Sequence, residues 1–353
     1  MAKTMLFGIC MLLIAGVICA CDRGSADETE TATELTRNGS PSATQPSGDP
    51  IEQMKAYIGD NNIHINSFIL IKDGETVEEA YFNGTSRDTA APVYSCTKSV
   101  LSALVGIAID EGKIASVDEK AIDLLDMEGI DLGDERESEI TLKHLLTMSS
   151  GLDPLPSDEY VNQTDAVAYI LQQPMHYEPG EIFAYTSGGP HVVSAILQQA
   201  TGMETSEYAQ EKLFDPLGIS QPVWRKDSKG LALGGFGLEL TPMQLAQFGC
   251  LYLNEGMWNG EQIVPKEWIA ESTGKSIDTK MTFECEQSGY GYYWWMNGFG
   301  GYAAHGYLGQ YVFVLPRSHA VAVFTSELPQ SSFPIPYELM AEYVLPSLEN
   351  VRA

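Results

Sequence analysis

The chain is poor in basic residues: 20 Lys and Arg stand against 48 Asp and Glu in 353 residues, which gives a formal net charge of −28. Nucleic acids and anionic membrane surfaces bind through clusters of positive charge, and a chain of this sign repels them. The scarcity of Lys and Arg therefore excludes nucleic acid as a partner. The hydrophobic content of 44% excludes a disordered chain and predicts a sizeable core.

Cysteine is also scarce. Six cysteines are too few for a disulfide-stabilised scaffold, and three of them lie within the first 21 residues. The other three, Cys96, Cys250 and Cys285, are an odd number and cannot all pair within one chain. We expect them to be buried thiols.

Metal-binding and alternative hydrolase motifs are missing as well. The six histidines never occur at His-Glu-x-x-His or comparable zinc spacing, so no metal or other cofactor is expected. The acidic stretch 126–139 lacks the residue order of an EF-hand and is predicted to be a solvated loop. No Gly-x-Ser-x-Gly elbow is present, which argues against a Ser-His-Asp hydrolase.

The first 20 residues have the pattern of a signal peptide. Lys3 precedes an apolar run of 16 residues, 5–20, which is short for a membrane-spanning helix of about 20 residues but typical of a signal-peptide core. The run ends in Ile-Cys-Ala-Cys, which resembles the bacterial lipobox and predicts lipidation of Cys21. An ordinary signal peptide cut near Ala20 or Ala26 is the alternative. We expect an exported protein.

Residues 21–50 are predicted to be the lipobox cysteine followed by a disordered tether. They are rich in Ser, Thr, Glu, Gly and Pro, and Leu35 is their only large aliphatic residue, so no burial offsets the entropy of ordering them. Such a tether would hold the protein at the bacterial cell envelope, where the lipid anchor would be its only contact with the membrane.

Residues 51–353 contain no further low-complexity segment and no internal repeat, which predicts one domain in two lobes. Two hairpins are predicted near its ends, one joining 67–71 to 76–82 through an Asp-Gly turn and one joining 311–315 to 320–325. Helical spacing predicts helices over 100–108, 142–146 and from Pro190 to a stop at Gly202. Helices between terminal strands indicate an α+β fold with a mixed or antiparallel sheet.

A serine and a lysine stand three residues apart at the start of the 100–108 helix, so Ser95 and Lys98 share a helix face. A serine hydroxyl needs a neighbouring base to become nucleophilic, and a lysine can serve where its pKa is lowered. Free N–H groups at the helix start can stabilise an oxyanion. The same spacing recurs at Ser272 and Lys275, but that pair ends a helical pattern and is expected to be silent.

Two further motifs give this pair its context. Residues 178–191 (EPGEIFAYTSGGPH) and 301–310 (GYAAHGYLGQ), with Ser95 and Lys98, resemble the three motifs of the serine β-lactamase and penicillin-binding-protein superfamily. Segments typical of its class C β-lactamase-like branch, which includes esterases and 6-aminohexanoate-dimer hydrolases, occur at 141–152, 213–219 and 240–249. The resemblance implies a mainly antiparallel sheet flanked by helices, with an inserted helical lobe.

The resemblance also implies roles for individual residues. Ser95 would be the acylated nucleophile, Lys98 its proton acceptor, and Tyr185 the group that passes the proton to the leaving group. The backbone N–H groups of Ser95 and Tyr307 would form the oxyanion hole. Because a free phenol has a pKa near 10, we expect the charge of Lys98 to bring the pKa of Tyr185 near the working pH.

The chain departs from the family pattern at two predicted substrate-binding positions. Ser187 stands where the family commonly has Asn, and its shorter side chain reaches less far. In the third motif, Ala304-His305-Gly306 lacks the cation that β-lactamases carry at its first position, and His305 is the candidate to replace it in part. An aromatic run at 290–295 would either line a substrate cleft or form a core strand.

These observations predict an exported serine hydrolase that cleaves an ester or a small amide through an acyl-enzyme on Ser95. The nearest alternative is a β-lactamase or D-Ala-D-Ala carboxypeptidase that uses the same residues. A non-catalytic module that binds peptidoglycan or another ligand is the third possibility. Such a module would not need Ser95, Lys98 and Tyr185 together.

Overall fold

The computed structural model describes residues 48–128, 130–279 and 289–350. The expected signal peptide, Cys21, nearly all of the tether and Cys285 lie outside these ranges. Within them, no helix combines the length and the apolar character needed to cross a membrane.

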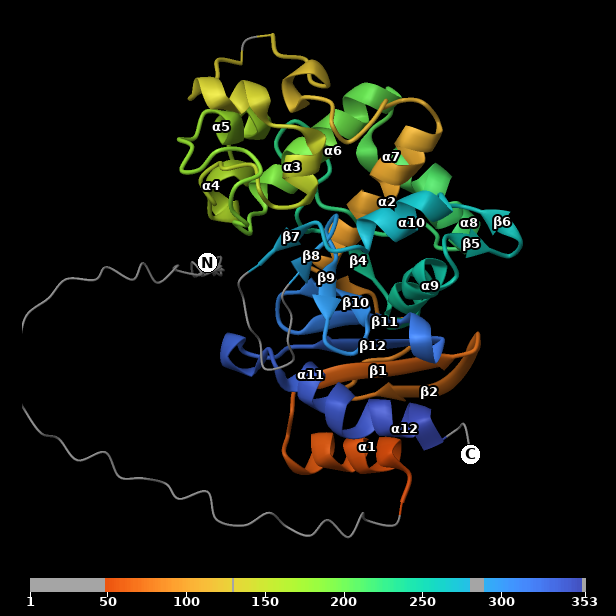
Figure 1. Cartoon of the computed structure of the whole chain (residues 1–353). Coiled ribbons are helices and arrows are strands. Elements are labelled where there is room, and N and C mark those ends of the chain that lie inside the picture. The colour runs from red at the N-terminus through yellow and green to blue at the C-terminus, as the bar shows by residue number, and fades with distance from the viewer. Residues whose placement is uncertain (1–47, 129, 280–288, 351–353) are drawn as a thin grey trace, which may run out of the picture.

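A sheet of eight strands lies at the centre of the described residues, and all its neighbouring strands are antiparallel (Figure 1). Its order is β2-β1-β12-β11-β10-β9-β8-β7, so the first and last long strands of the chain are neighbours. The bounds are β1 Ile65–Lys72, β2 Glu75–Tyr81, β7 Ile277–Asp278, β8 Gly289–Tyr290, β9 Trp295–Asn297, β10 Gly301–Gly306, β11 Gln310–Leu315 and β12 Ala320–Ser326. Two short pairs stand apart, β3 (Ala91–Pro92) with β4 (Glu239–Leu240) and β5 (Met257–Trp258) with β6 (Glu261–Gln262).

Both predicted hairpins are confirmed. Asp73 and Gly74 connect β1 to β2 with φ angles of 51° and 83°, the positive values that a two-residue hairpin turn requires. The single-turn helix η4 (Pro316–Ser318) connects β11 to β12.

Alternate residues of the central strands supply two separate cores. Phe68, Phe313 and Phe324 face a layer formed by α1 (Pro50–Asp60), α11 (Ile335–Leu339), η6 (Met340–Val344) and α12 (Leu345–Asn350). Ile69 and Val312 belong to the core on the opposite face, under α2 (Cys96–Asp110), α9 (Pro242–Leu253) and α10 (Lys266–Ser272). Because both faces are covered, the long strands are buried almost continuously.

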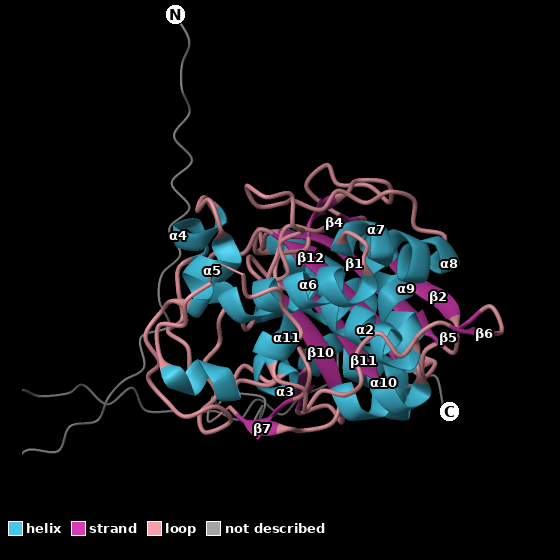
Figure 2. Ribbon diagram, turned by 90° about the horizontal axis from the view of Figure 1, so that it is seen from above, coloured by secondary structure: helices cyan, strands magenta, loops and turns pink. Residues whose placement is uncertain are grey.

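A lobe of helices lies above the sheet in Figure 1, and the view from above shows α4 and α5 projecting to one side of α2 and α6 (Figure 2). It contains α3 (Leu142–Leu146), α4 (Ser157–Val161), α5 (Ala166–Leu171), α6 (Gly188–Thr201), α7 (Thr205–Ala209), η3 (Gln210–Phe214) and α8 (Asp215–Leu217), with the short turns η1 (Ala121–Asp123) and η2 (Glu135–Glu139) before α3. A further short turn, η5 (Gln330–Ser332), precedes α11. The predicted α+β architecture with an inserted helical lobe is thus confirmed.

The three predicted helices are present, with one correction to a boundary. Residues 100–108 lie within α2, and 142–146 form α3. α6 begins at Gly188, two residues before Pro190, and ends where Gly202 adopts a φ of 71°. Pro190 still fits because the first turn of a helix needs no intrahelical partner for its N–H groups.

Two further predictions concern the cysteine thiols and the acidic stretch 126–139. Cys96 and Cys250 are free and buried, as predicted. The acidic stretch is not uniformly solvated, because the side chain of Glu137 in η2 is buried and accepts a bond from the backbone N–H of Gly133 at 3.2 Å. That burial raises the pKa of the Glu137 carboxyl to about 7.

Candidate active site

Ser95 and Lys98 meet at the start of α2, between the sheet and the helical lobe. Ser95 immediately precedes the first residue of the helix, and Tyr94 before it has a φ of 47°. Lys98 is 1% exposed. Its Nζ lies 2.9 Å from Ser95 Oγ, 3.2 Å from Ser187 Oγ and 2.7 Å from the backbone oxygen of Gly235.

The surroundings of Lys98 favour a neutral amine. Burial lowers the pKa of its ammonium group to about 7, and no carboxylate of the described residues forms an ion pair with it. A neutral amine has two N–H donors and one lone pair. Gly235 and Ser187 can accept the two N–H groups, which leaves the lone pair for the Ser95 hydroxyl.

Tyr185 lies three residues before α6, and its ring faces Lys98, whose Nζ is 4.9 Å from the ring centroid. Burial raises the pKa of the Tyr185 phenol, and a contact with the Ser95 hydroxyl opposes that rise only in part. The expectation that Lys98 would bring this pKa near the working pH is therefore wrong. Burial of the phenol outweighs any charge that Lys98 supplies, since Lys98, with a pKa of about 7, is only partly protonated near pH 7.

The loop 225–237 brings in Gly235, which the sequence analysis missed. A Cβ atom on Gly234 would lie 1.9 Å from the Pro190 backbone oxygen, and one on Gly235 would lie 2.8 Å from the Ser187 backbone oxygen. Only glycine allows this loop to pack so closely on the start of α6. The adjacent pair Gly234-Gly235 is the signal that could have drawn attention to this segment.

The two segments proposed for the oxyanion hole lie side by side. A Cβ atom on Gly306, the last residue of β10, would lie 2.4 Å from the Val93 backbone oxygen. The rings of Tyr94 and Tyr307, which flank these residues, are in edge contact with centroids 5.5 Å apart. Ser95 and Tyr307 are thus carried on adjoining segments of chain.

The turn after Tyr307 is fixed by two side chains that the sequence analysis also missed. Ser326 Oγ lies 2.7 Å from the backbone oxygen of Leu308 and 2.6 Å from that of Gly309. Gln310 Nε2 donates to the backbone oxygens of Tyr307 at 3.2 Å and Ser326 at 2.7 Å. Leu308 has a φ of 61°, so these bonds hold a conformation that the free chain rarely adopts.

His305 is not the replacement cation that the sequence suggested. Burial lowers the pKa of its imidazole to about 3, so the ring is neutral. His305 Nε2 and the Tyr337 hydroxyl are 2.7 Å apart, and the imidazole stacks on Trp295 at an interplanar angle of 7°. Trp295 in turn stacks on Tyr185, with ring centroids 5.7 Å apart. The remaining aromatic residues of that run are core residues.

The second Ser-x-x-Lys pair does not form a site. Ser272 is fully buried at the end of α10, and its hydroxyl lies 3.4 Å from the Ile269 backbone oxygen. Lys275 forms an ion pair with Asp278 at 3.1 Å instead. Elsewhere in the described parts of the chain, no group of three or more His, Cys, Asp or Glu side chains is arranged to hold a metal ion.

The antiparallel sheet, the inserted helical lobe and the serine at the start of the helix between them define a β-lactamase/transpeptidase-like fold. The chain belongs to the β-lactamase family, whose sequence profile, described as Beta-lactamase, matches residues 53–344. Members of this family are serine hydrolases.

Individual proteins are similar to this chain in sequence or in fold. The 6-aminohexanoate-dimer hydrolase of Paenarthrobacter ureafaciens is 24% identical over 293 residues, which cover 75% of this chain and 73% of the relative. A family VIII carboxylesterase superposes with a TM-score of 0.68 at 17% identity, over 84% of this chain and 96% of its own. A penicillin-binding protein homologue from Pyrococcus abyssi gives a TM-score of 0.67 at 19% identity, over 84% and 77% of the two chains.

Proposed function

We propose that this protein hydrolyses an ester or a small amide through an acyl-enzyme on Ser95. The observation that carries the proposal is the buried Lys98 amine with its lowered pKa, 2.9 Å from the Ser95 hydroxyl and held by Ser187 and Gly235. Burial of a lysine without a carboxylate partner costs free energy and lowers the pKa of the amine. A catalytic base uses the neutral amine that results, whereas a binding module has no need of it.

In this mechanism Lys98 accepts the Ser95 proton while Oγ forms a bond to the substrate carbonyl carbon. The carbonyl electron pair moves to oxygen, and the N–H groups of Ser95 and Tyr307 bind the resulting oxyanion. Collapse of the intermediate breaks the bond to the leaving group, which receives a proton through Tyr185. Water then attacks the acyl-enzyme by the same route and releases Ser95.

Tyr185 acts in this scheme as a neutral relay. A phenol with a raised pKa stays protonated at neutral pH. It can still donate its proton to a leaving group while it accepts one from Lys98. We expect Tyr185→Phe to lose less activity on p-nitrophenyl esters, whose leaving group needs little protonation, than on anilide amides.

The substrate class is part of this proposal, and the names of the relatives and the groups around the site support it. The names of the relatives include a carboxylesterase and a hydrolase of an amide-linked dimer, so both bond types are reasonable substrates. A β-lactam carries a carboxylate beside its reactive amide, and here Ala304 and a neutral His305 supply no cation for it. We therefore expect p-nitrophenyl butyrate to be cleaved with a higher kcat/KM than nitrocefin.

The test uses both serine-lysine pairs of the chain. We expect Ser95→Ala and Lys98→Ala each to lower kcat/KM for p-nitrophenyl butyrate by about a thousandfold or more, with unchanged circular dichroism. Ser272→Ala and Lys275→Ala are the matched controls and should keep most of the activity. A fluorophosphonate probe should label the wild type and not Ser95→Ala.

Three results would contradict these proposals. Full activity in Ser95→Ala would reject the nucleophile, and the absence of both turnover and probe labelling would favour the binding module. A kcat/KM for nitrocefin above that for the butyrate ester would favour the β-lactamase or carboxypeptidase alternative.

A further inference from the structure

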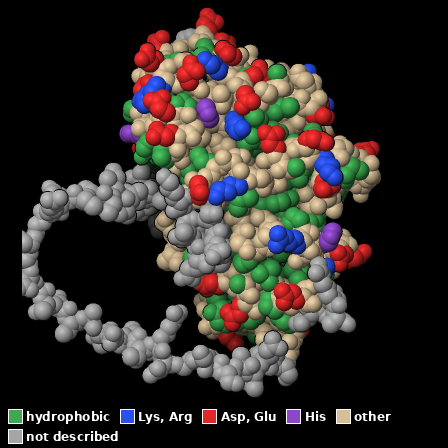
Figure 3. Space-filling view, in the orientation of Figure 1, with side chains coloured by type: hydrophobic (Ala, Val, Ile, Leu, Met, Phe, Trp, Pro, Cys, Tyr) green, Lys and Arg blue, Asp and Glu red, His purple; other side chains and the backbone are tan. Residues whose placement is uncertain are grey.

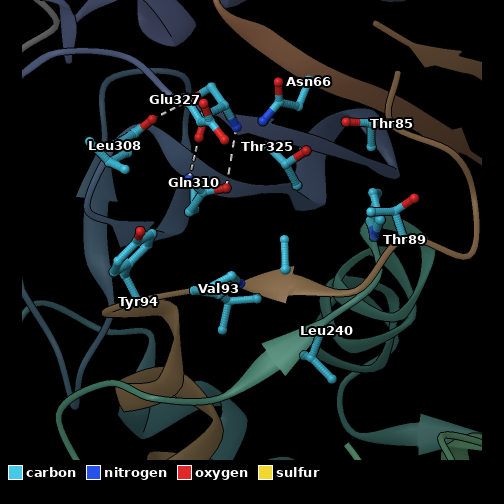
Figure 4. Close-up of a pocket in the computed structure, with 14 residues that line it drawn as sticks. Asn66, Thr85, Thr89, Val93, Tyr94, Leu240, Leu308, Gln310, Thr325 and Glu327 are labelled. Atoms are coloured by element: carbon cyan, nitrogen blue, oxygen red, sulfur yellow. Dashed lines mark hydrogen bonds between the residues drawn. The ribbon is translucent and has the colours of Figure 1, made fainter. Parts of the chain in front are cut away.

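A pocket of about 160 Å³ adjoins the catalytic cluster without being part of it. Tyr94 and Leu308 line it, and these residues neighbour Ser95 and Tyr307 in the chain, whereas Ser95, Lys98 and Tyr185 do not line it. Figure 4 shows Tyr94 and Thr89 on opposite sides of the opening, with Gln310 and Asn66 above and Leu240 below.

The buried polar side chains of this pocket are already bonded within the protein. Gln310 is held by the backbone oxygens of Tyr307 and Ser326, and the Thr325 hydroxyl lies 2.6 Å from Ser67 Oγ. They therefore contribute to the shape of the pocket more than to its affinity for a ligand.

Among the remaining polar groups of the lining, which include Asn66 and Thr85, the carboxylate of Glu327 is the one that offers a ligand a full charge. It is exposed and is the only charged side chain in the lining. No Lys, Arg or His of the described residues forms an ion pair with it, whereas Glu78, Glu79 and Glu204 each pair with a nearby cation. The negative charge reaches the pocket wall, because Glu327 adds to the rise in the pKa of Tyr94 that burial causes.

The opposite wall of the pocket is apolar. Val93, Leu240 and Pro242 are buried side chains that line it, whereas Leu308 lies on the same side as Glu327 (Figure 4). A ligand that matches both walls would carry a positive charge at one end and a short hydrocarbon chain at the other. Anionic ligands would be opposed by Glu327 and by the net charge of the protein.

We propose that this pocket binds a small alkylammonium ligand, with its ammonium group at Glu327 and its hydrocarbon chain against Val93, Leu240 and Pro242. The interaction is a charge-assisted hydrogen bond combined with burial of a few methylene groups, which together give weak but saturable binding. The proposal does not depend on hydrolysis.

The experiment measures binding of n-butylammonium chloride to the Ser95→Ala protein by calorimetry and ligand-observed NMR, because this variant cannot transfer an acyl group to the amine. We expect saturable binding that weakens at least tenfold when Glu327→Gln is added. Glu75→Gln, which removes an exposed carboxylate on β2, is the matched control and should leave the affinity unchanged. n-Butanol, the neutral analogue, should bind at least tenfold more weakly.

Each of three results would overturn the proposal. They are binding that is unaffected by Glu327→Gln, equal affinity for n-butanol, and the absence of saturable binding up to a 50-fold molar excess of n-butylammonium over the protein. Glu327 is exposed, so its replacement should leave the thermal unfolding temperature unchanged, and that temperature is measured in parallel. Failure of this test would leave the hydrolase proposal untouched, since the latter is judged on Ser95 and Lys98 alone.

Discussion

Lys98 is a buried cation-forming side chain whose contacts are with neutral oxygen atoms. The hydroxyls of Ser95 and Ser187 and the backbone oxygen of Gly235 offset part of the cost of its burial, but none carries a full negative charge. Burial therefore lowers its pKa to about 7, so that a large share of the amine is neutral at that pH. This property suits a base that must accept a proton from serine.

We expect a pH dependence of kcat/KM that reports the ionisation of Lys98. Below its pKa of about 7 the amine is protonated and cannot accept the Ser95 proton, so the rate should fall as the pH falls through 7. Above it the rate should reach a plateau. The measurement is the hydrolysis of p-nitrophenyl butyrate between pH 5.5 and 10.

Protein stability should vary in the same direction. In the unfolded chain this lysine has an ordinary pKa near 10.4, so it binds more protons than in the folded protein between pH 7 and 10. The group therefore makes folding more favourable as the pH rises through that range.

The pH profile of kcat/KM also has a contradicting outcome. A kcat/KM that keeps rising to pH 10, as for an ordinary lysine, would contradict the assignment of Lys98 as a base with a lowered pKa.

At the scale of elements, the site depends on how β10 and β12 end. β10 stops at Gly306, and the turn that follows is bonded to the last residue of β12 through Ser326. A Cβ atom on Gly309 would lie 2.3 Å from Ser326 Oγ, so the glycine and the serine fit only together. The turn in this way keeps the backbone of Tyr307 beside the start of α2.

We expect Ser326→Ala to lower kcat for p-nitrophenyl butyrate roughly tenfold with little change in KM, because a loosened oxyanion donor weakens binding of the transition state more than binding of the substrate. The measurement is steady-state kinetics together with the rate of fluorophosphonate labelling. Ser67→Ala is the matched control. Ser67 lies on β1, and its buried hydroxyl pairs with Thr325, the residue before Ser326 on β12, without contacting the turn. An equal loss in both variants would indicate a general effect of destabilising the sheet.

At the scale of the whole molecule, acidic side chains are spread over the visible surface and outnumber the basic ones (Figure 3). Such a surface would not hold the protein at an anionic membrane. We propose that the protein is exported and that a lipid on Cys21 attaches it to the cell envelope. The proposal rests on the signal-like run before Cys21 and the polar segment after it.

We expect Cys21→Ser to move the protein from the membrane fraction to the soluble exported fraction, because one hydrophobic anchor would be lost and no basic surface replaces it. The measurement is fractionation of cells that express the wild type or the variant, with activity on p-nitrophenyl butyrate as the readout. Cys19→Ser serves as the neighbouring control. A wild-type protein already found in the soluble exported fraction would contradict the lipoprotein proposal.

Much of the fold was predictable from local sequence patterns. The Asp73-Gly74 turn, the helix after Ser95 and the helix that ends at Gly202 depend on residues a few positions apart, and each was recognised. The family motifs likewise indicated Ser95, Lys98 and Tyr185 as a set. Gly235 and Ser326 were missed because their contacts join residues that are far apart in the chain. The aromatic run 290–295 was noted, but the stacking of Trp295 on Tyr185 and His305 depends on the same kind of distant contact.

The sequence by itself determined the family, the α+β class and the identity of the serine and lysine, since these follow from short motifs, turn residues and the helical spacing of apolar residues. Only the tertiary structure decided the protonation states. Burial lowers the pKa values of Lys98 and His305 and raises that of Tyr185, whereas the sequence had suggested a phenol tuned by charge and a histidine acting as a cation. A pKa depends on every group packed around an atom, and that packing is set by segments from the whole length of the chain.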